Sequence, residues 1–218
     1  MKARLDAILQ REQASYLDAL HPPSVELLAE MEDYAAANRV PIADREVALF
    51  LEITARATGA RKVLEVGMAI GYAVLHLLRG MGADGRVVTI EPSEEMIARA
   101  SDYFQRAGVN ERVRIERGYA LEVIPKLTEQ FDLVYLDALK EEYEDYLDLS
   151  LPLLRAGGVV IVDNLLWGGQ VAGEIRSPDQ QRSTEALRRF NQHFVNHKNL
   201  RAVVLPVGDG LGYGVKIR

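Results

Sequence analysis

The stretch RKVLEVGMAIGYAVLHLLRG, residues 61–80, decides the fold. Its short apolar run ends at Gly67, and a second glycine, Gly71, precedes a helical segment that begins at Tyr72. Further apolar runs follow along the chain, RVVTIE, RVRIERG, FDLVYLDA and GVVIVDN, with helical segments between them. This alternation is typical of βαβ units, so we predict an α/β fold with a mostly parallel sheet and right-handed crossovers.

Both ends of the chain depart from this alternation. Residues 1–58 are predicted to be a helical N-terminal extension of an α/β domain that spans residues 59–218. The segment SVELLAEMEDYAAANRV has the apolar spacing of a helix, with Ser24 as its N-cap, and a second helix follows Pro41. Near the C-terminus, RAVVLPVG and GLGYGVKIR are separated only by turn residues, which predicts an antiparallel hairpin at the sheet edge.

Composition excludes several classes of function. The 218 residues include no cysteine, so disulfides, thiolate metal sites and cysteine nucleophiles are excluded. A net charge of −6 argues against a generally basic surface that coats nucleic acid. Charges near the start interrupt any signal-peptide run, and no segment approaches the roughly 18 apolar residues of a membrane span. We therefore expect a soluble, cytoplasmic protein without a membrane partner.

The first two strand ends predict a nucleoside ligand, because open α/β sheets bind ligands at the carboxyl ends of their strands. Gly67 and Gly71 allow close approach to the backbone, but they do not form the G-x-G-x-x-G motif of dinucleotide sites. Glu65 would repel a phosphate and suits an amino-bearing ligand, while Glu91 could accept the hydroxyls of a ribose. S-adenosylmethionine fits this pattern better than NAD. An ordinary β–α turn, and a helix N-terminal charge ahead of Ser93, are the alternative interpretations.

Polar residues also follow the fourth and fifth strands. Asp137 ends YLD, with Lys140 three residues on, and Asp163 and Asn164 end VVIVDN. Two carboxylates and an amide at neighbouring strand ends suit Mg²⁺, Mn²⁺ or Ca²⁺ rather than zinc. The apolar residues that follow predict that this pair lies in a pocket walled by Trp167. Two separate strand-end turns are the alternative.

Together these segments resemble the cation-dependent class I O-methyltransferases, which include the catechol and caffeoyl-CoA O-methyltransferases. The resemblance covers residues 40–218, and its specific part is the combination DA-x-K and DN-x-x-W-G. It implies a Rossmann-like methyltransferase fold whose seven-stranded sheet has an antiparallel last strand. It also implies an S-adenosylmethionine cofactor and a divalent cation, usually Mg²⁺.

The resemblance assigns roles to individual residues. It implies metal ligands at Asp137, Asp163 and Asn164, with Asp137 also catalytic, and a general base at Lys140, whose pKa an adjacent cation would lower. A metal-bound hydroxyl oxygen also loses its proton more easily. The cofactor-binding positions that it implies are Ala43, Glu65, Gly67, Tyr72, Ala73, Glu91, Ala120 and Asp137, and the acceptor-pocket positions are Trp167 and Asp209.

Two positions depart from the family pattern. Ala73 stands where serine is common, which removes one hydrogen bond to the cofactor carboxylate, and Tyr119 stands where aspartate is frequent near the adenine. These departures leave the affinity for the cofactor open without changing the expected reaction.

Two classes of methyl acceptor compete. One is a small aromatic vicinal diol. The other is the hydroxylated wobble uridine of tRNA, because both ends of the chain resemble a bacterial branch that modifies it. The negative net charge and few lysines disfavour RNA, which binds largely through its phosphates. A small-molecule acceptor is therefore favoured, although a basic rim beside the pocket would change this. The candidates for such a rim are Arg176, Arg182, Arg188 and Arg189, although arginines in this pattern more often belong to a solvated helix face.

Three further expectations complete the sequence interpretation. A non-catalytic S-adenosylmethionine-binding protein is an alternative that the metal set and Lys140 argue against. A homodimer is expected from the family resemblance. His193 and His197 are one helical turn apart but lack the glutamate of a zinc-protease motif, so we interpret them as residues of a surface helix rather than a metal site.

Overall fold

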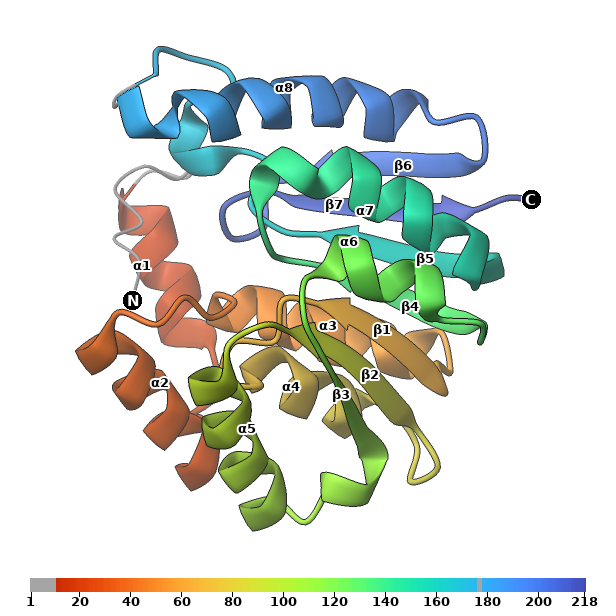
Figure 1. The fold of residues 1–218 in the computed structure, drawn as a ribbon. Coiled ribbons are helices and arrows are strands. Elements are labelled where there is room, and N and C mark those ends of the chain that lie inside the picture. The colour runs from red at the N-terminus through yellow and green to blue at the C-terminus, as the bar shows by residue number, and fades with distance from the viewer. Residues whose placement is uncertain (1–10, 176–177) are drawn as a thin grey trace.

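The computed structural model describes residues 11–175 and 178–218, in which a seven-stranded sheet lies between two layers of helices (Figure 1). The strand order is β3-β2-β1-β4-β5-β7-β6. Strands β1 to β5 are parallel, whereas β7 is antiparallel to both β5 and β6. The strands are β1 (Lys62–Val66), β2 (Arg86–Glu91), β3 (Val113–Arg117), β4 (Phe131–Leu136), β5 (Leu154–Val162), β6 (Leu200–Leu205) and β7 (Leu211–Lys216). The predicted Rossmann-like sheet and its antiparallel C-terminal hairpin are thus confirmed.

The helices connect these strands and precede them. The α-helices are α1 (Arg11–Leu20), α2 (Glu26–Asn38), α3 (Arg45–Ala57), α4 (Tyr72–Gly80), α5 (Glu94–Arg106), α6 (Ala120–Val123), α7 (Tyr143–Ser150) and α8 (Gln181–Asn196). Single 3-10 turns include η4 (Lys140–Glu142), directly before α7, and η6 (Trp167–Gly169) after β5. Within the described parts of the chain, none of the helices has the length and apolar character needed to cross a membrane.

Alternate residues of the central strands face two separate apolar cores. Val63 of β1 packs in one core with residues of α2, α3, α4 and α5, whereas its neighbour Leu64 packs in the other with α6, α7 and α8. All but the first residue of β1 are buried. Burial on both faces explains why these strands appear in the sequence as continuous apolar runs.

Strand register brings the functional strand ends to one edge of the sheet. Val66 is paired with Ile90 of β2 and with Leu136 of β4, and Leu136 is paired with Val162 of β5. The residue that follows each of these positions therefore lies at the same carboxyl edge. This edge is where the sequence predicts a ligand.

The N-terminal helices pack on the core that contains α3 and α4. Leu28, Met31 and Ala35 of α2 are buried there. The predicted N-cap is wrong, because Val25 occupies the cap position of α2 without a side-chain hydrogen bond. The Ser24 hydroxyl instead donates to Glu32 Oε1 at 2.6 Å. This hydrogen bond connects the segment before α2 to a side chain in the middle of that helix.

Candidate active site

The turn after β1 brings two strand ends into close contact. Gly67 has a φ of +97°, and a Cβ at this position would overlap the backbone carbonyl of Asp137, which follows β4. Gly71 caps α4 with a φ of +82°. A residue with a side chain would be strained at either position, so the two glycines explain how the backbone turns tightly at the cavity floor.

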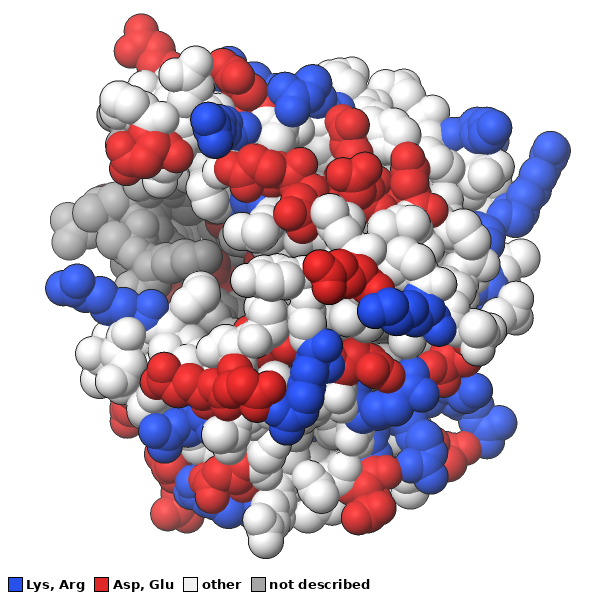
Figure 2. All heavy atoms as spheres, viewed as in Figure 1, with Lys and Arg blue, Asp and Glu red and all other residues white. Residues whose placement is uncertain are grey.

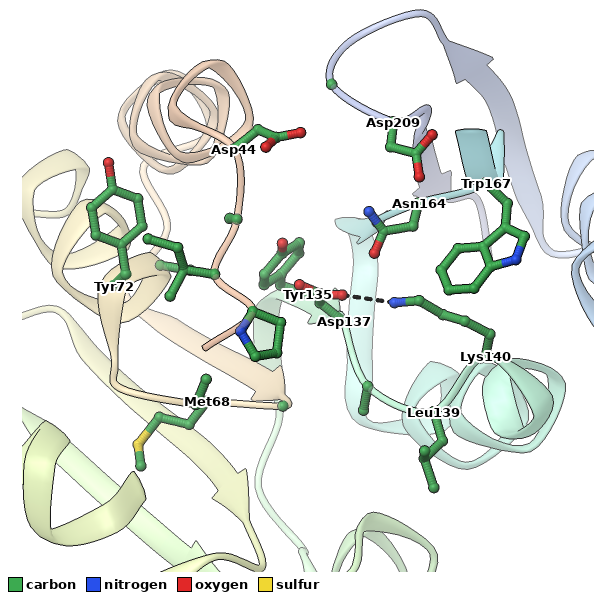
Figure 3. A pocket seen from close by; sticks show the side chains of 18 of the residues that line it. Asp44, Met68, Tyr72, Tyr135, Asp137, Leu139, Lys140, Asn164, Trp167 and Asp209 are labelled. Carbon is green, nitrogen blue, oxygen red and sulfur yellow. Dashed lines mark hydrogen bonds and ion pairs between the residues drawn. The ribbon is translucent and has the colours of Figure 1, made fainter. Parts of the chain in front are cut away.

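A cavity of about 950 Å³ opens at this carboxyl edge, between the loop before α3 and the loop after β5 (Figure 3). Ten residues predicted from the sequence line it: Ala43, Gly67, Tyr72, Ala73, Glu91, Asp137, Lys140, Asn164, Trp167 and Asp209. The structure therefore brings most of the predicted cofactor, metal and acceptor positions together in one place.

Glu91 closes one end of the cavity at the tip of β2. Its Oε2 accepts a hydrogen bond from the Ala69 backbone N–H, and its Oε1 accepts one from the Ser93 backbone N–H, both at 2.9 Å. These bonds fix the carboxylate. Because each carboxylate oxygen has two lone pairs, Glu91 can still accept a pair of ligand hydroxyls.

Glu65 lies beneath the cavity rather than in its lining. The side chain is fully buried, and Oε2 accepts a hydrogen bond from the Thr89 hydroxyl while Oε1 has no hydrogen-bond partner. Burial raises the pKa of Glu65 to about 8, and the nearby charges of Asp137 and Glu91 add to this effect. A neutral carboxyl group therefore predominates at pH 7.

Lys140 is held at the opposite end of the cavity by two oxygen atoms. Its Nζ donates to Asp137 Oδ1 at 2.8 Å (Figure 3), and it also donates to the Tyr143 hydroxyl at 2.6 Å. The Tyr143 hydroxyl in turn donates to the backbone carbonyl of Asp163 at 3.1 Å. Burial raises the pKa of Tyr143 well above its ordinary value, so its hydroxyl remains a donor. Lys140 is consequently fixed at the cavity surface rather than free to move in solvent.

The two polar residues after β5 have different surroundings. Asn164 lines the cavity and has a φ of +62°, a left-handed conformation that asparagine adopts more readily than most residues. Asp163 is not among the cavity-lining residues. Its Oδ2 accepts from the Tyr135 hydroxyl at 3.1 Å and its Oδ1 accepts from the Asn164 N–H at 2.7 Å. Both residues are buried, as predicted, with exposed fractions of 2% and 4%.

Trp167 and Asp209 form the wall beside Lys140. Asp209 Oδ1 accepts from the Gly168 N–H at 2.6 Å, which fixes the turn that carries Trp167. The Trp167 ring centroid is 6.0 Å from Lys140 Nζ, and its buried Nε1 has no hydrogen-bond partner. This wall offers a flat apolar surface next to a cationic group.

Sequence reasoning missed the network that joins the N-terminal helices to the cavity. Glu32 of α2 accepts hydrogen bonds from Ser24, from Arg45 and, at 2.7 Å, from the hydroxyl of the cavity-lining Tyr72. Partial burial opposes its charge, but these donors hold the pKa of Glu32 below its ordinary value. The adjoining residues 41–44 also line the cavity. A buried tyrosine at a helix start gives no sequence signal for a partner 40 residues away.

Other predicted positions lie outside the cavity lining. Ala120 is buried in the apolar core at the start of α6, and Tyr119 is 62% exposed. Arg188 donates to the backbone carbonyls of residues 170, 171 and 173, so it fixes a loop. Arg182 and Arg189 are exposed on α8, and Arg176 lies outside the described residues. Arg182 and Arg189 thus fit the interpretation as a solvated helix face, and Arg188 is engaged with the loop.

Comparisons with known proteins agree with this site. The family model described as O-methyltransferase matches residues 17–217. A catechol O-methyltransferase from Mycobacterium tuberculosis is 36% identical over 174 residues, which cover 78% of each chain. A second, from Niastella koreensis, is 32% identical over 162 residues and covers 72% of each.

Solved structures show the same architecture. The O-methyltransferase from Bacillus cereus, determined in complex with SAH, superposes with a TM-score of 0.82 at 29% identity, covering 94% of this chain and 97% of that one. Since the family model spans nearly the whole chain, the protein belongs to the O-methyltransferase family. The curated relatives that the chain matches include proteins named catechol O-methyltransferase and probable caffeoyl-CoA O-methyltransferase.

Proposed function

We propose that the protein transfers a methyl group from S-adenosylmethionine to a hydroxyl of a small, catechol-like aromatic acceptor, with the help of a divalent cation. The observation that carries this proposal is the arrangement within one cavity. Glu91 and the Gly67 turn are at one end, and Lys140, Asp137 and Asn164 are at the other.

The residues near β1 and β2 fit the cofactor. Glu91 retains the capacity to accept both ribose hydroxyls, and the missing side chain of Gly67 lets a ligand lie against the backbone. Glu65 lies beneath this part of the cavity, and its cofactor-binding role stays a prediction from the family resemblance. Ala120 remains the position predicted for the adenine side. When bound, the sulfonium of the cofactor supplies the methyl group.

The residues after β4 and β5 fit a hard cation. Asp137, Asp163 and Asn164 would hold it, because carboxylate and amide oxygens are ligands that Mg²⁺, Mn²⁺ and Ca²⁺ prefer. Asp137 and Asn164 line the cavity, and the Asp163 carboxylate accepts hydrogen bonds from the Asn164 N–H and from the hydroxyl of the cavity-lining Tyr135. When bound, such a cation lowers the pKa of an acceptor hydroxyl and orients its oxygen.

The chain's own residues then act on the acceptor. In its neutral amine form, Lys140 can take the hydroxyl proton at Nζ, and Asp137 and Tyr143 hold this atom at the cavity surface. Trp167 and Leu139 supply apolar contacts for an aromatic ring. Asp209 keeps the Trp167 turn in place through the Gly168 N–H. These contacts mainly position the acceptor, which accounts for much of the acceleration expected for such a transfer.

The surface favours a small acceptor over tRNA. Arg188 is engaged with loop carbonyls, and acidic side chains gather over α7 beside the site (Figure 2). An acidic surface repels the phosphate backbone on which RNA affinity largely depends. The curated relatives named catechol O-methyltransferase support the same acceptor class.

A parallel assay tests this proposal. Methyl transfer from labelled S-adenosylmethionine is measured with a panel of catechols and with tRNA that carries hydroxylated or unmodified wobble uridine, each with Mg²⁺ or with EDTA. We expect Mg²⁺-dependent methylation of a catechol only. Transfer to hydroxylated tRNA would establish the alternative acceptor. Binding of S-adenosylhomocysteine by calorimetry, with no transfer to any acceptor, would support a non-catalytic binding protein.

A homodimer is part of this proposal. Helix α1 exposes Tyr16, Leu17 and Leu20, whose exposed fractions are 65%, 40% and 59%. Exposed apolar groups in one element are suited to contact with a second subunit. Light scattering coupled to gel filtration measures the mass directly, and a monomer mass at micromolar concentration would reject the dimer.

A further inference from the structure

Two histidines and an aspartate come together on the outer surface of α7 and α8, on elements other than the loops that line the cavity. His193 belongs to the last turn of α8 and His197 directly follows that helix, and their ring centroids are 5.3 Å apart. Asp148 of α7 faces them, with Oδ1 3.4 Å from His193 Nε2. One ligand atom from each of the three residues lies within 4.8 Å of the other two. The sequence could not show this group, because Asp148 is 45 residues from His193.

The distance between His193 and Asp148 is compatible with two ligands of one metal ion. His193 Nε2 is buried, yet it makes no hydrogen bond, although the Asp148 carboxylate lies 3.4 Å away. Zinc bonds to nitrogen and oxygen are about 2.0–2.2 Å long, so ligand atoms around a tetrahedral ion are roughly 3.3–3.5 Å apart. The distance from His193 to Asp148 therefore equals one edge of such a tetrahedron.

The surroundings of the group also suit a cation. His197 is partly buried and its ring packs edge-on against that of His193, so the two imidazoles come together on one side of the group. His197 Nδ1 accepts a long hydrogen bond of 3.3 Å from the Asn199 N–H, which a bound metal would displace at modest cost. The acidic residues of α7 and η4 add negative charge nearby, as the band of red side chains over α7 shows (Figure 2).

We propose that Asp148, His193 and His197 form a second metal site, which binds a transition-metal ion such as Zn²⁺ and links α7 to α8. Two imidazoles and one carboxylate favour zinc, cobalt or nickel over Mg²⁺. The exposed face of the group leaves room for water as the remaining ligand. The site differs in ligand chemistry from the oxygen cluster of the cavity, so the two can be loaded independently. This inference does not depend on the proposed acceptor.

Zinc titration of the untagged protein in excess Mg²⁺ tests the site. Calorimetry gives the number of zinc ions and their affinity, and thermal melts measure stabilisation. When free zinc is one hundred times Kd, the Tm is expected to rise by about 5–10 °C because zinc binds only the folded site. The double variant His193→Gln/His197→Gln is expected to bind zinc at least tenfold more weakly, and Asp148→Asn several-fold more weakly.

Matched variants separate this site from others. Asp145→Asn removes an acidic residue of the same helix, and His21→Gln removes the histidine of a different cluster with Asp18 and Glu46. Both are expected to bind zinc as the wild type does. Equal melts of all variants in EDTA show that each folds. The proposal is overturned if the wild type binds no zinc beyond the cavity, if the double variant keeps wild-type affinity, or if only His21→Gln loses binding.

Discussion

Replacing Glu65 with glutamine measures how strongly the fold opposes ionisation of this carboxyl group. The folded pKa is about 8 against an ordinary value of 4.5, because the side chain is fully buried. Between these values the folded protein binds one proton more than the unfolded chain. The free energy of unfolding therefore falls by about 1.4 kcal/mol per pH unit from this group alone. The stabilisation is complete below pH 4.5 and is lost as the pH rises through 8.

Glutamine imitates the protonated acid at this position. Its amide oxygen can keep the hydrogen bond from Thr89, and its amide nitrogen takes the place of the unpartnered oxygen. The stability difference between Glu65→Gln and wild type should grow in favour of the variant by about 2 kcal/mol between pH 6 and pH 8. Other titrating groups cancel in this difference, because both proteins contain them.

Urea denaturation at half-unit steps from pH 6 to pH 8.5, without cofactor, provides the measurement. Glu111→Gln, an exposed carboxyl on a surface turn, is the matched control and should follow the wild-type profile. A Glu65→Gln difference that stays constant across this range would show that the buried carboxyl is already ionised at pH 6. The reasoning from burial would then be wrong.

Four further predictions concern the cavity. Glu91→Gln should weaken S-adenosylhomocysteine binding about tenfold in calorimetry and leave the KM for the acceptor unchanged, since it removes charge-assisted hydrogen bonds to the ribose. Lys140→Met should lower kcat at least a hundredfold while cofactor affinity is kept, as expected for loss of a general base. Replacing Asp163 with alanine should abolish turnover, and so should EDTA treatment of the native protein. Excess Mg²⁺ should restore activity only to the EDTA-treated protein. Activity that persists in EDTA would show that no cation is needed. Glu32→Gln should reduce the affinity for the cofactor a few-fold, because it weakens the hydrogen bond that fixes the Tyr72 side chain. An unchanged affinity would show that this network stabilises the fold without contributing to cofactor binding.

The sequence predicts the sheet and most of the cavity for a simple reason. Buried strands give continuous apolar runs, and their carboxyl ends share one edge once the strands are parallel. Glu91, Asp137 and Asn164 could therefore be placed from their order alone. Side-chain direction cannot be placed in this way. Asp163 and Asn164 are adjacent, yet only Asn164 lines the cavity, whereas the Asp163 carboxylate accepts the hydrogen bond of Tyr135, a residue of the cavity lining.

Long-range polar contacts are the other feature that local patterns miss. Ser24 has the residue type and position of an N-cap, but Glu32 offers its hydroxyl a better acceptor, and that choice depends on Arg45 and Tyr72 from other helices. The histidines of α8 are similar. Their spacing is visible in the sequence, but the Asp148 that completes the group comes from α7. Tertiary packing therefore supplies partners that spacing cannot predict.

The charges at the carboxyl edge explain why this cavity suits cationic ligands. Glu65, Glu91, Asp137 and Asp163 all lie there, and burying several carboxylates together is unfavourable unless each is neutralised or hydrogen-bonded. The fold meets this condition in different ways: Glu65 takes up a proton, Glu91 and Asp163 accept backbone N–H groups, and Asp137 pairs with Lys140. A ligand that brings positive charge, such as a sulfonium with its ammonium group or a divalent cation, relieves the remaining repulsion. A pyrophosphate would increase it, which is the physical reason that a nicotinamide dinucleotide does not fit the same strand ends.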